Sequence, residues 1–272
     1  MSKTILITGA TDGIGLETAK RLVLEGHRVL IHGRNDEKLA QVKTALQTAV
    51  YTHGHCAAVE SYLADLSDLT QVQTMAKAIL AQYESIDVLI NNAGVYATQH
   101  PRLANGADVR FVVNTLAPLL LTQLLWPAFH PQSRVVNLSS AAQSSVDLTA
   151  LRGEKALNDG EAYAQSKLAL TMWSRLLGLS HPEGPVVVAI NPKSFLGSKM
   201  VKDAYGIAGS DLSVGADILY RAALGDEFAT AHGQYYDNDI EAFSHPPMDA
   251  LNEPMVRQVV ASLEALLTPY LT

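Results

Sequence analysis

Short, nearly continuous apolar runs alternate along the chain with longer stretches of helical periodicity. Each short run predicts a buried strand, and each longer stretch predicts a helix. The predicted strands cover residues 4–7, 28–32, 57–63, 86–90, 134–138, 186–190 and 234–237. The predicted helices cover residues 16–25, 36–49, 69–83, 109–129, 161–177, 214–224 and 250–267. This alternation predicts an α/β fold, a doubly wound parallel (Rossmann) sheet of about seven strands with helices on both faces.

Glycines gather where the first predicted strand meets the first predicted helix, in the segment TGATDGIG at residues 8–15. Glycine lets the backbone approach a diphosphate closely, and a helix N-terminus offers free N–H groups with a partial positive charge. This placement favours nucleotide binding over a purely structural glycine turn. The cofactor-binding residues predicted in this turn are Gly9, Asp12, Gly13, Ile14 and Gly15.

The second predicted strand ends in His32-Gly33-Arg34. A site selective for NAD carries a carboxylate at this point, which binds the adenosine ribose hydroxyls. No carboxylate is present there, and the guanidinium group of Arg34 could instead pair with a 2′-phosphate. The sequence therefore favours NADP(H) and leaves NAD(H) open, with a solvated surface arginine as the alternative interpretation.

Small or polar residues also follow the third and fourth predicted strands. Asp65 and Leu66 follow the third strand, and the Asp65 carboxylate could accept a hydrogen bond from an adenine amino group. Asn91, Ala93 and Gly94 belong to the sequence NNAG that ends the fourth strand. Their small side chains leave room for a flat group at the carboxyl ends of the strands, where α/β folds bind ligands. An ordinary turn is the alternative.

Residues 109–129 are long and apolar enough to test as a membrane span. Polar residues, Pro118 and Pro127 interrupt the run, so a buried helix is the favoured interpretation. Pro118 lacks the N–H that would bond the carbonyl of Asn114, and a kink would free this acceptor for a water molecule. The helix is apolar nearly all round, and a second subunit could therefore cover part of it.

Tyr163 and Lys167 lie four residues apart in the predicted helix 161–177 and so share one of its faces. An ammonium group beside a phenol favours the phenolate and lowers its pKa from about 10, which permits proton transfer near neutral pH. Most tyrosine–lysine pairs at this spacing are ordinary surface neighbours. The pair becomes a candidate catalytic site only in combination with the nucleotide-binding signals.

The sixth predicted strand ends in Asn191-Pro192, and residues 193–212 contain three glycines, at 197, 206 and 209. Such a stretch predicts a loop that could close over a substrate. No linker divides the sequence. Residues 1–272 are therefore predicted to form a single dinucleotide-binding oxidoreductase domain, with the substrate loop at about 193–212.

The charge and cysteine content exclude some classes of protein. A formal net charge of -7 argues against a nucleic-acid partner. The single cysteine, Cys56, fits a reducing compartment, and the N-terminal apolar run is too short for a signal peptide or membrane anchor. We therefore expect a cytoplasmic protein without a membrane anchor. His53 and His55 flank Gly54, but no metal site is expected because no ligand cluster accompanies them.

Together these segments resemble the short-chain dehydrogenase/reductase family over most of the chain. TGATDGIG resembles the family's TGxxxGxG cofactor loop, and NNAG matches its motif of the same sequence. Asn114, Ser140, Tyr163 and Lys167 resemble its Asn-Ser-Tyr-Lys tetrad. Ser140 is chosen over Ser139 because the family usually places its catalytic serine second in such a pair.

The spacing from Ser140 to Tyr163 and the segments AYAQSKLA and GQYY resemble the retinol dehydrogenase-like branch of the family. One position departs from the family pattern. The family has Pro-Gly after the sixth strand and then a threonine that holds the nicotinamide amide. Here Lys193 follows Pro192, and Gly197-Ser198 lie near the threonine position. The resemblance implies that Pro192 contacts the cofactor. It does not extend to the glycine and threonine with which the family clamps the nicotinamide amide.

The resemblance implies an NADP(H)-dependent oxidoreductase that interconverts an alcohol and a carbonyl group on a small-molecule substrate. Tyr163 would be the general acid/base, and Lys167 would lower its pKa and hold the nicotinamide ribose. Ser140 would bind the substrate oxygen, and Asn114 would hold a water molecule that links Lys167 to solvent. A homodimer or homotetramer is expected.

Two alternatives stay open from the sequence. The first is a catalytically silent nucleotide-sensing or interaction protein on the same fold, because fold does not imply function. The second is an epimerase or dehydratase acting on a nucleotide-linked sugar. The second ranks last because such enzymes typically have a different glycine spacing and a larger C-terminal domain.

Overall fold

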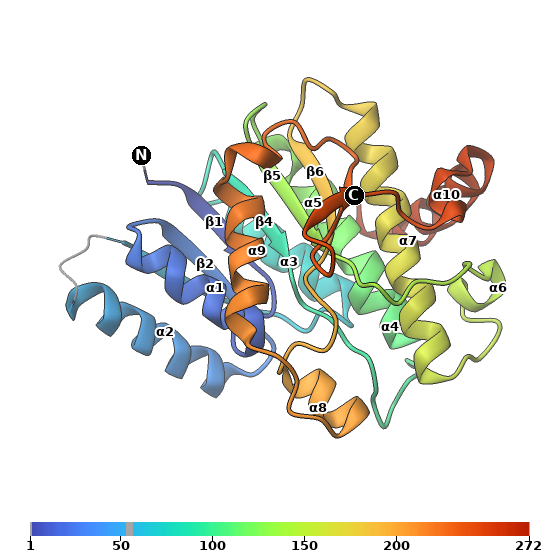
Figure 1. Cartoon of the computed structure of the whole chain (residues 1–272), viewed down its shortest axis with the longest axis horizontal. Helices are drawn as coiled ribbons and strands as arrows, with labels where there is room; N and C mark the ends of the chain where they lie inside the picture. Colours follow the sequence, from blue (N-terminus) through green and yellow to red (C-terminus); the bar gives the residue numbers. More distant parts are fainter. Residues whose placement is uncertain (1, 53–56, 272) are drawn as a thin grey trace.

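The computed structural model describes residues 2–52 and 57–271. Its strands form an 8-stranded sheet in the order β3-β2-β1-β4-β5-β6-β7-β8 (Figure 1). The strands are β1 (Thr4–Ile7), β2 (Arg28–Gly33), β3 (Val59–Leu63), β4 (Val88–Asn91), β5 (Arg134–Leu138), β6 (Val186–Asn191), β7 (Tyr235–Asp237) and β8 (Ala242–Ser244). Every neighbouring pair is parallel except β7 with β8. The predicted doubly wound fold is confirmed, but the predicted strand count misses the short antiparallel edge strand β8.

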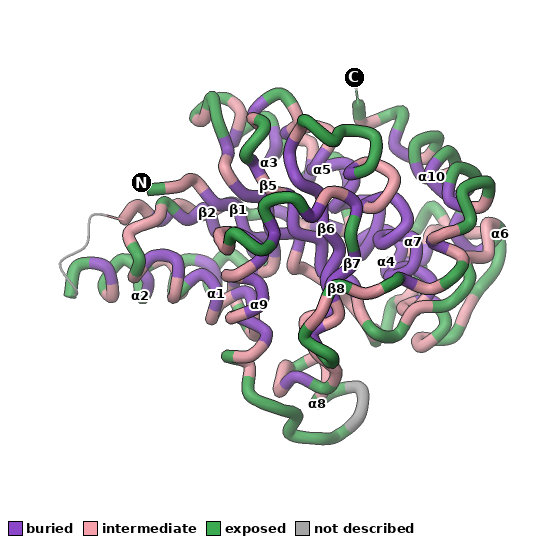
Figure 2. Tube along the Cα trace, turned by 45° about the horizontal axis from the view of Figure 1, so that its top comes forward, coloured by how far each residue is buried: buried purple, intermediate pink, exposed green. Residues whose placement is uncertain are grey.

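Helices cover both faces of the sheet. One face carries α1 (Gly13–Leu24), α2 (Asp36–Thr52) and α9 (Leu212–Leu224). The other face carries α3 (Leu69–Leu80), α5 (Ala117–Leu125), α7 (Asp159–Ser180) and α10 (Glu253–Leu267). Ile5 and Ile7 of β1 pack into the first layer and Leu6 into the second, as the two-residue period of a strand requires. Figure 2 shows the buried positions concentrated along the sheet between these layers.

The predicted apolar helix is a chain of four helical segments. They are α4 (Val109–Phe111), a π-helical turn (Val112–Leu116), α5 and a 3₁₀ turn (Trp126–Ala128). In the π turn the Ala117 N–H bonds the carbonyl of Val112, five residues back. This wider turn contains Asn114 and ends two residues before Pro118. The irregularity expected at the proline therefore takes the form of a π turn, a common feature of functional sites.

Val109–Ala128 is the one helical stretch among the described residues that is long and apolar enough to cross a membrane, and 78% of its apolar window is buried inside the molecule. α3 packs against α5, and α7 packs against the π turn. The same chain therefore covers this helix, as the buried-helix interpretation expects. Its apolar surface gives no independent evidence for a second subunit.

Short helices also occur in two segments outside the predicted helices. Residues 193–212 include α8 (Lys199–Tyr205), so the prediction of a continuous loop is wrong there. The Ser198 side chain caps its N-terminus, and Gly206 ends it with a left-handed φ of 68°. The segment between β5 and α7 contains α6 (Leu148–Leu151). The remaining predicted strands and helices are present, with ends shifted by a few residues.

Candidate functional site

The loops after β1 and β4 lie against each other at the carboxyl end of the sheet. Asn92 Nδ2 donates to the carbonyl oxygens of Thr8 at 2.8 Å and Gly9 at 3.0 Å. The backbone N–H of Ala93 donates to Thr8 Oγ1 at 3.1 Å. The glycine-rich turn and the NNAG segment thus form one rigid unit. The sequence prediction included the other three residues of NNAG but missed Asn92, whose side-chain amide makes two of these hydrogen bonds.

The three glycines of the turn have different tasks. Gly9 has φ 65°, and a Cβ atom there would lie 2.9 Å from the Ala93 Cα, which is too close. A Cβ on Gly15 would lie 2.4 Å from Asn92 Nδ2. At Gly13, with φ 56°, the nearest atom would be the Ser198 Cβ at 3.9 Å. Gly9 and Gly15 therefore permit close packing, whereas at Gly13 the positive φ, rather than a close neighbour, favours glycine.

Asp12 sits at the N-terminus of α1. One carboxylate oxygen accepts from the Gly13 N–H at 2.8 Å, and the other accepts from Lys38 Nζ at 2.7 Å. The hydrogen bond from Lys38 is the main cause that lowers the pKa of Asp12. Ile14 follows in the first helical turn, where N–H groups have no partner within the helix. Asp12 thus shapes the turn and lies next to the N-terminus of α2.

A buried histidine, missed by sequence reasoning, supports the glycine turn from behind. His32 Nδ1 accepts from the Gly9 N–H at 3.1 Å, so its Nε2 carries the hydrogen and donates to the Ala64 carbonyl at 3.0 Å. Burial lowers the pKa of His32 to about 4. A neutral imidazole therefore joins the turn after β1 to the end of β3. A lone histidine within an otherwise apolar strand was the available signal.

The predicted adenosine contacts are spread along the ends of β2 and β3. Arg34 is exposed directly after β2. Asp65 is half-buried, and its Oδ1 accepts from the backbone N–H of Ser67 at 2.9 Å and from its hydroxyl at 2.8 Å. The side chain of Leu66 is buried in the core, so only its backbone can face a ligand. The structure brings Asp65 and Arg34 to the same end of adjacent strands.

Asn91, one of the predicted cofactor-binding residues, has a buried side chain. Its side chain is 3% exposed. Its Nδ2 donates to Asn137 Oδ1 at 2.8 Å and to Thr122 Oγ1 at 3.3 Å, within the layer that contains α5. Only the backbone of Asn91 is therefore available for cofactor binding at this position. The side chain ties β4 to β5 instead.

Lys167 and Asn114 converge on Gly94. A Cβ atom on Gly94 would lie 3.4 Å from Asn114 Oδ1 and 3.6 Å from Lys167 Nζ. The Lys167 amine is buried and donates to the Leu138 carbonyl at 2.6 Å. Burial lowers its pKa to about 7. An amine that changes charge near neutral pH therefore lies at the end of β5, beside the NNAG segment.

Asn114 is held in the π turn by a complete set of hydrogen bonds. Its Oδ1 accepts from the Val95 N–H at 2.8 Å, and its Nδ2 donates to the Val95 carbonyl at 2.9 Å and to Ser166 Oγ at 3.0 Å. Its side chain thus joins the segment after NNAG to α7. The expected water bound near Asn114 stays a prediction.

Tyr163 lies on the same side of α7 as Lys167 and is partly exposed. The Lys167 amine is 5.6 Å from the centre of the Tyr163 ring. The Tyr96 ring packs at 4.9 Å between centroids, tilted by 55°. The shared helix face predicted from the spacing of four is therefore present, with an aromatic neighbour from the loop after β4.

The N-terminal turn of α7 is firmly anchored. Asn158 and Glu161 form a reciprocal capping box. Arg110, which is fully buried, pairs with Asp108 at 2.6 Å and also with Asp159. Removing one partner of a buried pair is costly, so this network holds α7 against α4. Tyr163 begins the second turn of a helix whose position is well defined.

The two serines after β5 have different environments. Ser139 is 3% exposed, and its Oγ shares a 2.7 Å hydrogen bond with Thr171 Oγ1 beneath the strand end. Ser140 is half-buried, and its Oγ accepts from the Ala142 N–H at 3.1 Å. Ser139 is thus used in packing, which supports the choice of Ser140 as the candidate catalytic serine.

The segment after β6 lies over the open side of this site. α8 brings the Met200 methyl group to 3.6 Å from a Cβ placed on Gly94. Ser198 Oγ accepts from the Val201 N–H at 3.3 Å and so caps α8. Pro192 begins the segment, and its carbonyl accepts from Asn238 Nδ2 at 3.0 Å. The role of residues 193–212 as a substrate loop stays a prediction.

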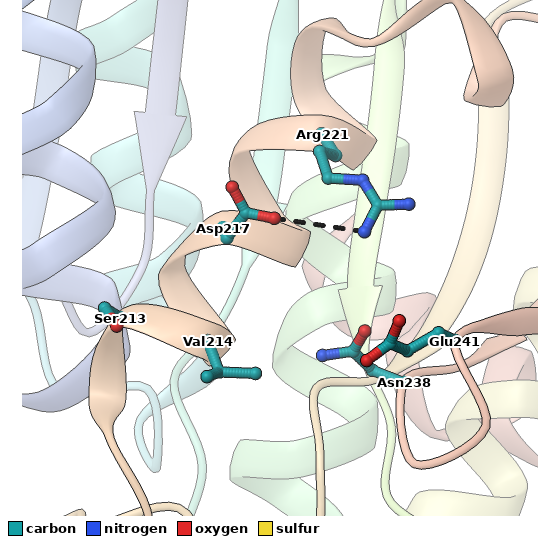
Figure 3. A pocket seen from close by; sticks show the side chains of 6 residues that line it. All are labelled: Ser213, Val214, Asp217, Arg221, Asn238 and Glu241. Atoms are coloured by element: carbon teal, nitrogen blue, oxygen red, sulfur yellow. Dashed lines mark ion pairs between the residues drawn. The ribbon is translucent and has the colours of Figure 1, made fainter.

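A cavity of about 300 Å³ lies between α9 and the turn after β7 (Figure 3). It is lined by Ser213, Val214, Asp217, Arg221, Asn238 and Glu241. Its arginine is already paired with Glu227 at 2.7 Å and lies 3.9 Å from Asp217. None of the predicted catalytic residues lines this cavity.

Within residues 2–52 and 57–271, no three histidine, cysteine, aspartate or glutamate side chains form a cluster that could hold a metal ion. The candidate ligands His53 and His55, together with Cys56, lie outside the described residues. The described site therefore consists of hydroxyl, amide and amine groups around the carboxyl ends of β1, β4 and β5.

Comparison with known proteins agrees with this geometry. The sequence model of short chain dehydrogenases matches residues 3–205. Human retinol dehydrogenase 11 is 39% identical over 179 residues, covering 64% of this chain and 55% of the relative. Human retinol dehydrogenase 13 is 29% identical, covering 95% of this chain and 82% of the relative. The chain spans only about half the length of the first of these relatives.

Solved structures share the same architecture. An uncharacterised protein from Mycobacterium paratuberculosis superimposes with a TM-score of 0.80 at 25% identity, covering 98% of this chain and 93% of the other. A short chain dehydrogenase from Escherichia coli CFT073, complexed with NADPH, has a TM-score of 0.67 at 27% identity, covering 87% and 96%. The chain belongs to the short chain dehydrogenase family. Two predictions are thereby confirmed: the chain is a member of this family, and it resembles the retinol dehydrogenase-like branch.

Proposed function

We propose that this protein is an NADP(H)-dependent oxidoreductase that interconverts an alcohol and a carbonyl group by hydride transfer. The observation that carries the proposal is the convergence of Lys167 and Asn114 on Gly94, next to the glycine-rich turn. A Cβ on Gly94 would make ordinary contacts with both polar groups, so the amide oxygen of Asn114 and the amine of Lys167 border the same space beside the NNAG segment. At Gly13, at the N-terminus of α1, the nearest atom to a Cβ would be 3.9 Å away. Both features fit a dinucleotide laid across the strand ends.

The preference for NADP(H) over NAD(H) rests on the end of β2. Arg34 is exposed there, and no carboxylate occupies the position that would bind the ribose hydroxyls of NAD. The Escherichia coli neighbour complexed with NADPH and a Shigella flexneri neighbour complexed with NADP support the same preference. The nicotinamide supplies the hydride acceptor or donor when the dinucleotide is bound.

Each candidate catalytic residue has a task that its position suits. Tyr163 gives a proton to the developing alkoxide during reduction and takes it back during oxidation. Ser140 donates a hydrogen bond to the substrate oxygen, where negative charge grows. Lys167 holds the nicotinamide ribose, and its pKa of about 7 allows it to exchange protons near neutral pH. Asn114 fixes the segment through which a water molecule would connect Lys167 to solvent.

The first prediction concerns the general acid/base. Replacing Tyr163 by phenylalanine removes the transferable proton but keeps the ring that packs on Tyr96. We expect kcat for carbonyl reduction to fall by about 10²–10⁴ with little change in the NADPH dissociation constant. Tyr220→Phe, on α9, is the matched control. Turnover at the parent rate in the Tyr163 variant would contradict the assignment.

The second prediction concerns the cofactor. Arg34→Ala removes a charge-assisted hydrogen bond to a 2′-phosphate, so the NADPH dissociation constant should rise about tenfold or more. The NADH dissociation constant should stay unchanged, since NADH lacks that phosphate. Arg28→Ala makes the same charge change at the opposite end of β2 and should affect neither. If Arg34→Ala weakened the binding of NADPH and of NADH by the same factor, a contact with the 2′-phosphate would be ruled out.

A catalytically silent nucleotide-binding protein is the second candidate. The departure at Pro192-Lys193 and the use of the Ser198 hydroxyl as a helix cap favour it, because both alter the segment that clamps nicotinamide in the family. A carbonyl and alcohol panel decides between the two. The retinol and polyprenol dehydrogenases among the relatives suggest beginning with apolar primary alcohols and aldehydes. Tight NADPH binding without turnover across the panel would favour the silent protein.

The remaining proposals concern the domain organisation, partners, cellular location and oligomeric state of the protein. We place residues 1–272 in a single dinucleotide-binding domain whose substrate loop is 193–212. We propose a small-molecule substrate, no nucleic-acid partner and a cytoplasmic location. A homodimer or homotetramer stays a prediction.

A further inference from the structure

The backbone carbonyl of Ser140 receives two side-chain hydrogen bonds. Tyr235 Oη donates to it at 3.2 Å, and Gln143 Nε2 donates to it at 2.8 Å. Gln143 is a near neighbour in sequence, but Tyr235 is 95 residues away. Two donated hydrogen bonds fix the direction of this carbonyl. They therefore also fix the orientation of the peptide group of Ser140, the candidate catalytic serine.

The sheet order explains how Tyr235 reaches this carbonyl. Tyr235 pairs with Ala189 of β6 and with Ser244 of β8, so β6 separates it from β5. Its ring is 5% exposed and lies on the face covered by α7, while the next residue, Tyr236, packs into the opposite layer. The phenol spans the width of β6 and ends at the turn after β5. Burial raises the pKa of Tyr235, so it stays a neutral donor.

The hydrogen bonds around Ser140 also define the direction of its hydroxyl. Oγ accepts from the Ala142 N–H at 3.1 Å. Among the described residues this is the hydroxyl's one hydrogen bond, and its own hydrogen is therefore left for another acceptor. A substrate oxygen beside Tyr163 would be that acceptor under the proposed function. Transition-state stabilisation depends on holding such a donor within about 0.5 Å of its productive position.

We propose that Tyr235 is a positioning residue for Ser140. It does not touch the reacting atoms but holds the Ser140 peptide so that the hydroxyl faces the substrate oxygen. The inference rests on the proposed oxidoreductase function and adds to it a residue from β7, two strands away from β5 in the sheet. If the inference is correct, the Tyr235 hydroxyl affects the rate of the chemical step only through the Ser140 hydroxyl. This dependence distinguishes a positioning role from a general contribution of Tyr235 to folding.

A double-mutant cycle tests this dependence. The variants are Tyr235→Phe, Ser140→Ala and the double variant, with Tyr236→Phe as the matched control. Tyr236 undergoes the same chemical change one residue along β7, where its hydroxyl accepts from Arg221 at 3.2 Å on the other face. Single-turnover reduction of a carbonyl substrate by bound NADPH measures the chemical step, and the NADPH dissociation constant is measured in parallel.

We expect Tyr235→Phe to slow the chemical step by about threefold to tenfold, the effect of one hydrogen bond. The NADPH dissociation constant should not change, and Tyr236→Phe should react at the parent rate. In the Ser140→Ala background, Tyr235→Phe should have no further effect, since the hydroxyl that it positions is already gone.

Three results would overturn the inference while leaving NADP(H)-dependent oxidoreduction intact, and the third would also remove the role assigned to Ser140. They are a Tyr235→Phe variant that reacts at the parent rate, the same loss in both backgrounds, and a Ser140→Ala variant that reacts normally. The second result would show that Tyr235 affects the chemical step without acting through the Ser140 hydroxyl. A wild-type protein that binds NADPH but turns over no substrate would instead overturn the proposed function, and this inference with it.

Discussion

At the residue scale, Lys193 is the most unusual position in the chain. Its φ is 126°, a value that side chains rarely adopt, and it occupies the position where the family pattern has glycine. The backbone thus keeps a glycine-like conformation although the residue is lysine. The surrounding bonds enforce this conformation, because Asp239 accepts from the backbone N–H of Ser194 at 2.9 Å and from its hydroxyl at 2.6 Å. Such strain costs on the order of 1–3 kcal/mol.

Replacing Lys193 by glycine should therefore stabilise the protein. The relief of strain exceeds the extra backbone entropy that glycine loses on folding, about 0.5–1 kcal/mol, so we expect a net gain of about 1 kcal/mol. Urea unfolding followed by circular dichroism measures it. Lys193→Ala removes the same amine but keeps the strained φ, and it should give no gain. Equal stability of the glycine and alanine variants would show that the strain is negligible.

At the element scale, α7 carries two of the four candidate catalytic residues, Tyr163 and Lys167, and is supported at its N-terminus and by neighbouring helices. Its N-terminus is held by the capping box and by Arg110, and α10 packs along it through Val256, Val259, Val260 and Leu263. The π turn contributes Asn114 from the other side. A helix supported by three neighbours holds Tyr163 and Lys167 in a constant position, as proton transfer requires.

α8 shows what sequence reasoning can miss at this scale. Residues 193–212 contain three glycines, which predicted a loop, yet Ser198 and Gly206 are an N-cap and a left-handed C-cap around seven helical residues. The capping signals were present in the sequence. The three glycines outweighed these capping signals in the prediction, because a helix this short has little hydrophobic periodicity and depends on tertiary packing.

At the scale of the whole molecule, buried titratable groups make the stability depend on pH. The pKa of His32 is about 4 in the folded protein and 6.5 when unperturbed. As the pH falls from 6.5 to 4, the unfolded chain binds a proton that the folded protein does not. The free energy of unfolding should therefore decrease over this range, by up to about 3 kcal/mol from this residue.

A His32→Gln variant isolates this contribution. Glutamine can still bond the Gly9 N–H but does not titrate, so the difference in the free energy of unfolding between pH 7.5 and pH 4.5 should shrink by about 2–3 kcal/mol. Urea unfolding at the two pH values measures it. His181→Gln, on an exposed histidine, is the control and should leave the difference unchanged. A parent-like pH dependence in the His32 variant would contradict the buried neutral imidazole.

The sequence by itself determined the order of strands and helices, the glycine turn, and the shared face of Tyr163 and Lys167. These features follow from local periodicity and backbone freedom, which nearby residues control. Only the tertiary structure decided that the Asn91 side chain faces the helical layer, that His32 supports Gly9, and that Tyr235 reaches Ser140. Each of these contacts joins segments far apart in the chain, so it depends on strand order and register, which local patterns do not specify.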